Sequence, residues 1–270
     1  MRKTLIQTLL AAFCAILATA PLEGGGVMLI GMRYEMRSGK GMPTARDYVQ
    51  DGLVAVYDGI ENAGWGVHDP NATVWKDLTG NGWDFPATNL TFHDDRVEVL
   101  AYVASVKSSA DFWNWTGGTV DGTFERPTTT AKNNGFLAFG RLGIVSINTN
   151  SVNGCMWYTS ASASNWRCLY PFGRASSSPG ARAFEKAHRA FASDFTQSYA
   201  NQRYYQNGVR YIGYDETWTQ NVAHSALTPS LSVGTVGTPK FYGLRIYSRA
   251  LTADEVAVNY TIDKARFNLP

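Results

Sequence analysis

Charged residues are scarce in this chain of 270 residues. Asp, Glu, Lys and Arg together make up 17% of the chain, against roughly a quarter in an average soluble protein. The formal net charge is +2, and the basic residues are scattered rather than clustered. A protein that binds nucleic acid needs a concentrated positive field to neutralise phosphates, so the sequence predicts no nucleic-acid partner.

Cysteine is also rare. The chain has 3 cysteines, Cys14, Cys155 and Cys168, which are too few for the disulfide framework of a small secreted domain. Cys14 falls in the N-terminal apolar stretch. Cys155 and Cys168 are left either as a disulfide pair in an oxidising compartment or as two buried thiols of adjacent strands, and the sequence favours neither.

Catalytic motifs are missing as well. There is no Gly-x-Ser-x-Gly elbow, no glycine-rich phosphate loop and no His/Cys cluster at zinc spacing. Retaining glycosidases hold two carboxylates roughly 5 Å apart across the scissile bond, but Glu98 stands alone here. Asp215 and Glu216 are adjacent, so a strand would send them to opposite faces. The sequence therefore predicts a protein that is not an enzyme, with a glycoside hydrolase as the least favoured alternative.

The first twenty residues have the pattern of a secretory signal peptide. Arg2 and Lys3 precede a mostly apolar stretch, residues 5–20, which ends in small residues. Pro21 directly follows the expected cleavage site, and a second apolar patch lies further along the chain, so an uncleaved membrane anchor is the alternative. The apolar stretch of about 16 residues is, however, short for a membrane span of roughly 20. We expect a secreted or cell-surface protein, which contacts a membrane only if this segment stays uncleaved. Residues 21–47 are glycine-containing, basic and without periodicity, which predicts a linker or weakly ordered arm.

From residue 48 onward, short apolar or alternating runs are separated by turn residues about every ten positions, which is typical of antiparallel β-sandwiches. Asn81-Gly82 and Asn207-Gly208 favour tight turns. We expect one all-β domain over residues 48–270. The predicted strands are 53–57, 96–105, 136–139, 143–147, 154–159, 166–170, 189–192, 197–206, 231–233 and 241–247. Short helices are predicted at 181–187 and at 253–260, the second opened by a capping box of Thr252 and Glu255.

Three blocks in the chain resemble a known family. The first is Asp51 to Gly59 followed by Val74-Trp75-Lys76-Asp77-Leu78-Thr79-Gly80-Asn81-Gly82, the second is Tyr204 to Val209, and the third is Phe241 to Val256. In this order they are similar to the opening, the Y-x-N-G hairpin and the closing strand and helix of laminin-G-like, concanavalin A-like lectin/glucanase domains. The resemblance implies an antiparallel jelly-roll β-sandwich with a short C-terminal helix, and it identifies a fold rather than a function.

Sugar binding on such a fold needs exposed aromatic faces together with polar side chains. Aromatic residues with polar neighbours occur in three loop-like stretches, and the candidate ligand-binding residues are Trp113, Trp115, Trp166, Trp218 and Asp215. Trp218 has the most polar setting. The alternative is that these tryptophans belong to the core, which for any single tryptophan is the more frequent outcome.

Many relatives on this fold bind one calcium ion. Asp77, Asn81 and Asp84 offer hard oxygen ligands of the type calcium takes, and the alternative is an Asx-turn in which they cap local amides. The sequence thus predicts an exported, non-catalytic binding module for carbohydrate or another cell-surface or matrix ligand. A structural or adhesive surface protein acting through protein contacts is the alternative.

Overall fold

The structure is a computed structural model that describes residues 42–108, 115–125, 134–139, 142–146, 154–159, 165–169, 186–194, 203–211, 218–221, 230–233 and 238–270. Within residues 134–169, and for residues 218–221 and 230–232, it describes the backbone alone. Residues 40–270 form one compact unit. The predicted signal peptide or anchor and most of the predicted linker lie outside the described residues.

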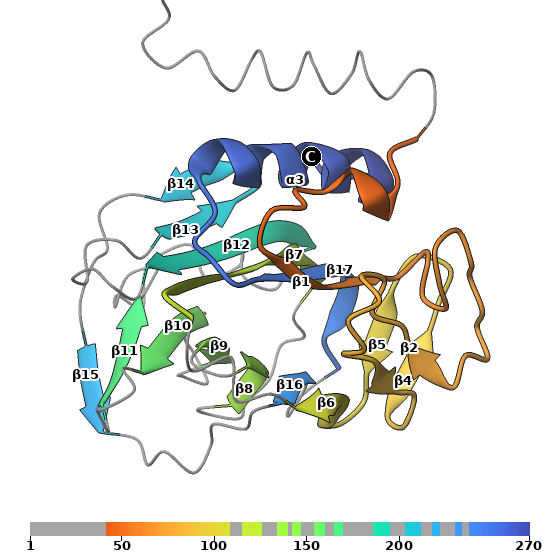
Figure 1. Cartoon of the computed structure of the whole chain (residues 1–270), viewed down its shortest axis with the longest axis horizontal. Coiled ribbons are helices and arrows are strands. Elements are labelled where there is room, and N and C mark those ends of the chain that lie inside the picture. The colour runs from red at the N-terminus through yellow and green to blue at the C-terminus, as the bar shows by residue number, and fades with distance from the viewer. Residues whose placement is uncertain are drawn as a thin grey trace, which may run out of the picture. The chain divides into compact units, whose positions relative to one another are not determined.

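In the described part of the chain, the strands form two large antiparallel sheets and one small one (Figure 1). The eight-stranded sheet has the order β14-β13-β12-β7-β17-β5-β4, and β1 also pairs with β17. Its strands are β1 (Leu53–Asp58), β4 (Leu90–Phe92), β5 (Val97–Val99), β7 (Gly117–Glu125), β12 (Ala187–Asp194), β13 (Arg203–Gln206), β14 (Val209–Tyr211) and β17 (Lys240–Tyr247).

The seven-stranded sheet has the order β15-β11-β10-β9-β8-β16-β6 among the described residues. Its strands are β6 (Val103–Ser108), β8 (Asn134–Phe139), β9 (Leu142–Ser146), β10 (Gly154–Thr159), β11 (Asn165–Leu169), β15 (Trp218–Asn221) and β16 (Ser230–Val233). A small sheet pairs β2 (Val74–Trp75) with β3 (Phe85–Pro86). Two helices are described, the 3-10 helix η1 (Ala45–Asp47) and α3 (Ala253–Phe267).

The hydrophobic core lies between the two large sheets. Phe124 and Phe241 come from the eight-stranded sheet, Val103 and Val233 come from the seven-stranded sheet, and all of them belong to one buried cluster. Trp75 of the small sheet is fully buried in the same cluster, and complete burial of a side chain of this size contributes several kcal/mol at about 25 cal/mol per Å². The predicted antiparallel jelly-roll β-sandwich with a C-terminal helix is confirmed.

The strand predictions differ from the structure at several places, and two of the differences involve long runs of the chain. The run expected as one strand over residues 96–105 is two strands, β5 and β6, in different sheets, because the chain crosses between the sheets at the exposed residues Leu100 and Tyr102. Strand β7 was not predicted, although it is central in its sheet. Its alternate residues Thr119, Asp121 and Thr123 are polar yet fully buried, so the pattern lacks the apolar content of a buried strand.

Strand β17 contains an irregularity. Strict alternation of faces would place Phe241 on the same face as Arg245 and Tyr247. The pairing with β7 shifts register between Phe241 and Gly243, so Phe241 joins Leu244 in the main core. Arg245 and Tyr247 are left on the opposite face. A β-bulge changes which residues share a face in this way, and hydrophobicity alone does not locate it.

Helix α3 covers the outer face of the eight-stranded sheet near β7 and β12 (Figure 1). The predicted capping box is confirmed: the Thr252 hydroxyl accepts from the Glu255 amide at 3.3 Å, and the Glu255 carboxylate accepts from the Thr252 amide at 2.8 Å. The helix continues to Phe267 rather than ending at residue 260. Of the other predicted helix, Ala187 belongs to β12, and residues 181–185 lie outside the described residues.

Candidate functional site

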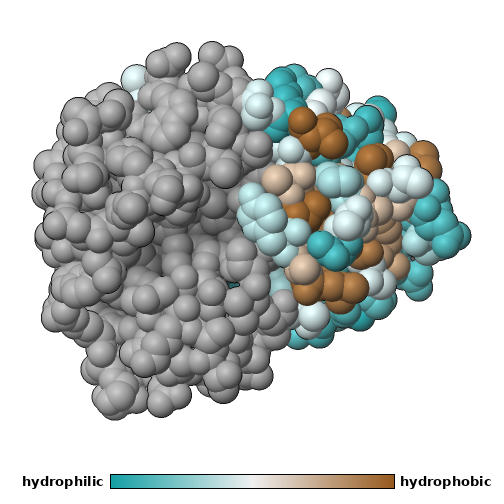
Figure 2. All heavy atoms as spheres, turned by 90° about the horizontal axis from the view of Figure 1, so that it is seen from below, coloured by the Kyte–Doolittle hydropathy of each residue, from teal (hydrophilic) through white to brown (hydrophobic). Residues whose placement is uncertain are grey.

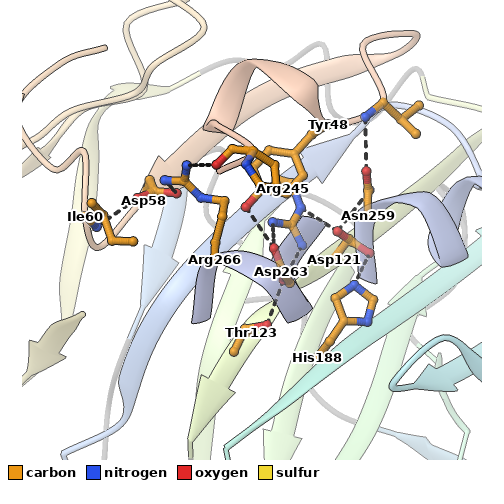
Figure 3. A network of polar contacts seen from close by, with 12 residues as sticks. Tyr48, Asp58, Ile60, Asp121, Thr123, His188, Arg245, Asn259, Asp263 and Arg266 are labelled. Carbon is orange, nitrogen blue, oxygen red and sulfur yellow. Dashed lines mark hydrogen bonds and ion pairs between the residues drawn. The ribbon is translucent and has the colours of Figure 1, made fainter. Parts of the chain in front are cut away.

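A buried ionic network lies between β7, β17 and α3 (Figure 3). The two terminal nitrogens of Arg245 each donate to one oxygen of Asp263 at 2.8 Å, and the Arg245 Nε donates to Asp121. His188 Nε2 lies 3.0 Å from the other Asp121 oxygen. Burial disfavours the charged form of Asp121, but Arg245 and His188 outweigh it and hold the pKa of this carboxyl below its usual value.

Polar neighbours complete this network. The hydroxyls of Tyr48 and Thr123 donate to the Asp263 carboxylate at 2.8 Å and 2.7 Å. The Asn259 amide donates to Asp121 at 3.0 Å and to the Tyr247 hydroxyl at 2.9 Å. Asp121, Asp263 and Arg245 are fully buried, so a ligand cannot reach them. The network fixes α3 on the sheet and is not a catalytic carboxylate pair.

The strand register assigns the two faces of the seven-stranded sheet. Val233 is buried in the core and is paired with Leu137, which begins the row Leu137, Ile144, Met156, Leu169 across β8, β9, β10 and β11. Directly paired residues lie on the same face of a sheet, and successive residues lie on opposite faces. This row therefore lies on the core side of the sheet.

The neighbouring row lies on the face away from the core. It runs through Ser232, Ala138, Gly143, Trp157, Cys168 and Trp218. Trp166 is two residues from Cys168 in β11, so it shares this face. The structure thus brings the predicted residues Trp166 and Trp218 to one face on neighbouring strands and adds Trp157 beside them, at the end of the sheet where β15 is the last strand.

The other predicted ligand-binding residues are not part of this arrangement. Trp115 is partly buried and packs against the main core, which favours the core interpretation for this residue. Trp113 and Asp215 lie outside the described residues. Trp157 was not selected from the sequence because it lies inside the predicted strand 154–159, and only the register shows which face it occupies.

The turn at Asp77, Asn81 and Asp84 is held by local hydrogen bonds. Asp77 accepts from the Val56, Thr79 and Trp83 amides at 3.2, 3.0 and 3.2 Å. Asp84 accepts from the Asp77 amide at 2.9 Å.

Two ammonium groups lie beside this turn. Lys76 Nζ is 2.7 Å from Asp84, and Lys107 Nζ donates to the Asn81 carbonyl at 2.8 Å. The bonds that Asp77 and Asp84 accept from backbone amides are those of an Asx-type turn. Calcium binding at this turn stays a prediction. In the described part of the chain, no group of three or more His, Cys, Asp or Glu side chains is arranged to hold a metal ion. Neither described helix is long and apolar enough to cross a membrane.

No family model matches the chain, and no curated protein matches it. Among solved structures, it is similar to Trypanosoma rangeli sialidase in complex with the inhibitor DANA, with a TM-score of 0.49 and 15% identity over 87% of this chain and 37% of that one. It is also similar to the ligand binding domain of botulinum neurotoxin serotype D in complex with N-acetylneuraminic acid, with a TM-score of 0.49 and 10% identity over 78% of this chain and 51% of that one. The chain spans about half or less of each of these proteins.

Proposed function

We propose that the chain is an exported, non-catalytic binding module that holds a carbohydrate on the face of the seven-stranded sheet away from the core. One observation carries this proposal. The register of β10, β11 and β15 places Trp157, Trp166 and Trp218 on that face. Core residues such as Val233 occupy the other face, so packing between the sheets does not account for three tryptophans at these positions.

The residue types at these positions suit a sugar ligand. An indole offers a flat apolar surface that stacks on the C–H side of a pyranose, and amides and hydroxyls satisfy the sugar hydroxyls. Thr159 and Gln220 pair with Trp166 from either side and share its face. The rest of the row toward β16 consists of the small residues Gly143, Ala138 and Ser232. An extended face of this kind suits an oligosaccharide chain.

The buried acids Asp58, Asp121 and Asp263 are paired within the fold and give no support to turnover. Asp121 and Asp263 bind Arg245, and Asp58 binds Arg266 at 2.8 Å. A carboxylate that is fully buried and paired with arginine has no access to substrate and cannot act as acid, base or nucleophile. These acids therefore stabilise the fold.

A second candidate function is adhesion through protein contacts. Leu100, Tyr102 and Val106 are exposed near β5 and β6, with Val106 at 70%. Exposed apolar side chains that form a continuous patch mark protein interfaces. Figure 2 shows apolar side chains separated by polar ones on the described part of one face. A protein interface needs a continuous apolar patch, so this candidate ranks second.

The test is a glycan-array screen of the full chain, with and without calcium, followed by affinity measurements on Trp157→Ala, Trp166→Ala and Trp218→Ala. We expect saturable binding that weakens about tenfold or more in each variant, which corresponds to about 1.4 kcal/mol. Val209→Ala, an exposed apolar residue in β14 of the eight-stranded sheet, is the matched control and should bind normally. Silence across the array by folded protein would move support to the adhesive candidate, and full affinity in all three variants would reject the site.

A further inference from the structure

The loop between β1 and β2, residues 59–73, presents a tryptophan at its tip. Figure 1 shows it as the orange segment that extends from the end of β1. The tip is a tight turn, because the Ala63 amide donates to the Val67 carbonyl at 3.2 Å and the Val67 amide donates to the Gly64 carbonyl at 3.0 Å. Trp65 in this turn is 36% exposed, and Val67 is 50% exposed.

The base of the loop is held by buried ionic groups (Figure 3). Asp58 accepts from the Ile60 and Glu61 amides at 2.8 Å and 2.9 Å. Arg266 of α3 donates to Asp58 at 2.8 Å and to Glu61 at 3.2 Å. The second Glu61 oxygen accepts from the Gly66 amide at 3.0 Å. A chain of contacts thus runs from α3 to the residue next to Trp65.

Asn62 closes the loop from inside. Its side chain is fully buried, donates to the Asp69 carbonyl at 2.7 Å and accepts from the Asp69 amide at 2.8 Å. Its own carbonyl accepts from the Lys76 amide at 2.9 Å. Both ends of residues 62–69 are therefore held together by one side chain, which fixes the conformation of the tip.

Packing in the core clusters does not account for this construction. Desolvation makes buried ions destabilising unless their partners are well placed. Here the buried ions fix a turn whose tip belongs to none of the core clusters. Gly66 has φ of +69°, and a Cβ added there would meet no atom within 4 Å. A rigid turn that holds a partly exposed indole is the arrangement of a preorganised ligand contact.

The groups around Trp65 indicate the class of ligand. The Arg46 guanidinium lies 4.9 Å from the centroid of the Trp65 ring and so occupies one face of the indole. His68 Nδ1 lies 3.1 Å from the Ile60 carbonyl, and its Nε2 lies 4.0 Å from an oxygen of the exposed Asp94. The Arg46 guanidinium is thus a hydrogen-bond donor beside the ring, and His68, which pairs with Asp94, belongs to the same loop.

We propose that the Trp65 loop is a second binding site, which takes a neutral pyranose by stacking on the exposed part of the indole. Sugar hydroxyls accept hydrogen bonds, so a pyranose on the indole can accept from the Arg46 guanidinium beside it. The site shares no residue with the tryptophan face of the seven-stranded sheet, and this proposal does not depend on the function proposed for that face.

The test measures binding of the full chain to immobilised cellohexaose, xylohexaose, mannohexaose and chitohexaose. A Trp157→Ala/Trp218→Ala background removes the other proposed site. In this background we expect at least one oligosaccharide to bind, and Trp65→Ala to weaken it at least tenfold. Trp65→Phe, which keeps a stacking ring, should lose less than Trp65→Ala. Val67→Ala is the matched control in the same turn and should bind unchanged, and unfolding midpoints verify that each variant is folded.

The outcomes separate the two proposals. Binding that survives Trp65→Ala but disappears in the Trp157→Ala/Trp218→Ala background would overturn the Trp65 site and support the sheet face. Binding that disappears only with Trp65→Ala would support the Trp65 site and overturn the sheet face. Failure of the folded parent chain to bind any of the four oligosaccharides would overturn the Trp65 site as stated.

Discussion

Arg245 shows how much of this fold depends on single buried charges. It lies at 0% exposure between Asp121 and Asp263, and aspartates on both sides raise the pKa of its guanidinium against the opposing effect of burial. Removing one partner of a buried ion pair leaves the other charge without compensation. Such losses are far larger than those of ion pairs on the surface.

Asp121→Asn should therefore lower the free energy of unfolding by about 3–5 kcal/mol. The substitution keeps the size of the side chain but removes the charge that faces Arg245 and His188. Asp51→Asn is the control, since Asp51 is 84% exposed and pairs with Arg249 at 2.7 Å, and its loss should be below about 1 kcal/mol. Urea denaturation compares the variants, and equal losses would contradict the role assigned to burial.

The same residue predicts a pH dependence. The pKa of Asp121 is lower in the folded protein than its usual value, so below about pH 4 the unfolded chain takes up the proton first. The stability that Asp121 contributes is thus present at neutral pH and is lost as pH falls through its folded pKa.

Unfolding curves at several pH values test this sign. The difference in stability between the parent chain and Asp121→Asn should shrink below about pH 4. Burial raises the pKa of Asp58 although Arg266 opposes it, so the contribution of Asp58 is largest in acid and is lost as pH rises. The difference between the parent and Asp58→Asn should accordingly grow on acidification. Parallel pH profiles for the two variants would contradict these directions.

At the scale of elements, the pairing of β10 with β11 decides between the two interpretations of the cysteines. Cys168 is paired with Trp157, so Cys155 is displaced by two residues. Diagonal neighbours of this kind lie about 7–8 Å apart, whereas the Cα atoms of a disulfide are usually about 4.4–6.8 Å apart.

We therefore expect Cys155 and Cys168 to be free thiols. Alkylation of the denatured chain without reductant, followed by mass spectrometry of the peptides, should label both cysteines fully. The reduced and alkylated chain is the control and should give the same labelling. A peptide pair joined by a disulfide would mean that β10 and β11 have another register.

Elements with local signals could be predicted from the sequence. Thr252 and Glu255 define the start of α3 through contacts three residues apart, and Asn207-Gly208 forms the expected turn, with positive φ at both residues. Strand β7 has no such local signal, because the partners of its buried residue Asp121 are distant in the chain, Arg245 by 124 residues. The tryptophan face depends on register between strands, and the Trp65 loop depends on Arg266 of α3, so neither could be found locally.

At the scale of the whole molecule, α3 joins segments that are far apart in the chain. Asn259, Asp263 and Arg266 lie on one helix and bind groups before β1 and in β1, β7 and the β1–β2 loop. Ionic contacts of this type hold α3 on the sheet and orient the Trp65 loop at the same time. The position of the loop is therefore coupled to the docking of the helix.

The segment before β1 belongs to this assembly. Tyr48 is 2% exposed and stacks on the Arg245 guanidinium, whose central carbon lies 4.0 Å from the ring centroid. The Val49 amide donates to Asn259 at 3.0 Å, and Arg266 donates to the Pro43 carbonyl at 2.8 Å. The domain thus extends N-terminal to residue 48, where the sequence pattern placed its start, because polar contacts rather than periodicity tie residues 43–49 to the helix.

A chain starting at Met42 should consequently be much more stable than one starting at Gln50. The shorter chain loses Tyr48, so Arg245 and Asp263 lose a buried neighbour, and Arg266 loses the Pro43 carbonyl. We expect a difference of about 3–5 kcal/mol in the free energy of unfolding, the size found when a buried ionic cluster is left incomplete. Tyr48→Phe in the longer chain isolates the hydroxyl and should lower stability by about 1–3 kcal/mol. Coincident urea transitions for the two chains would show that residues 42–49 rest on the helix without stabilising it.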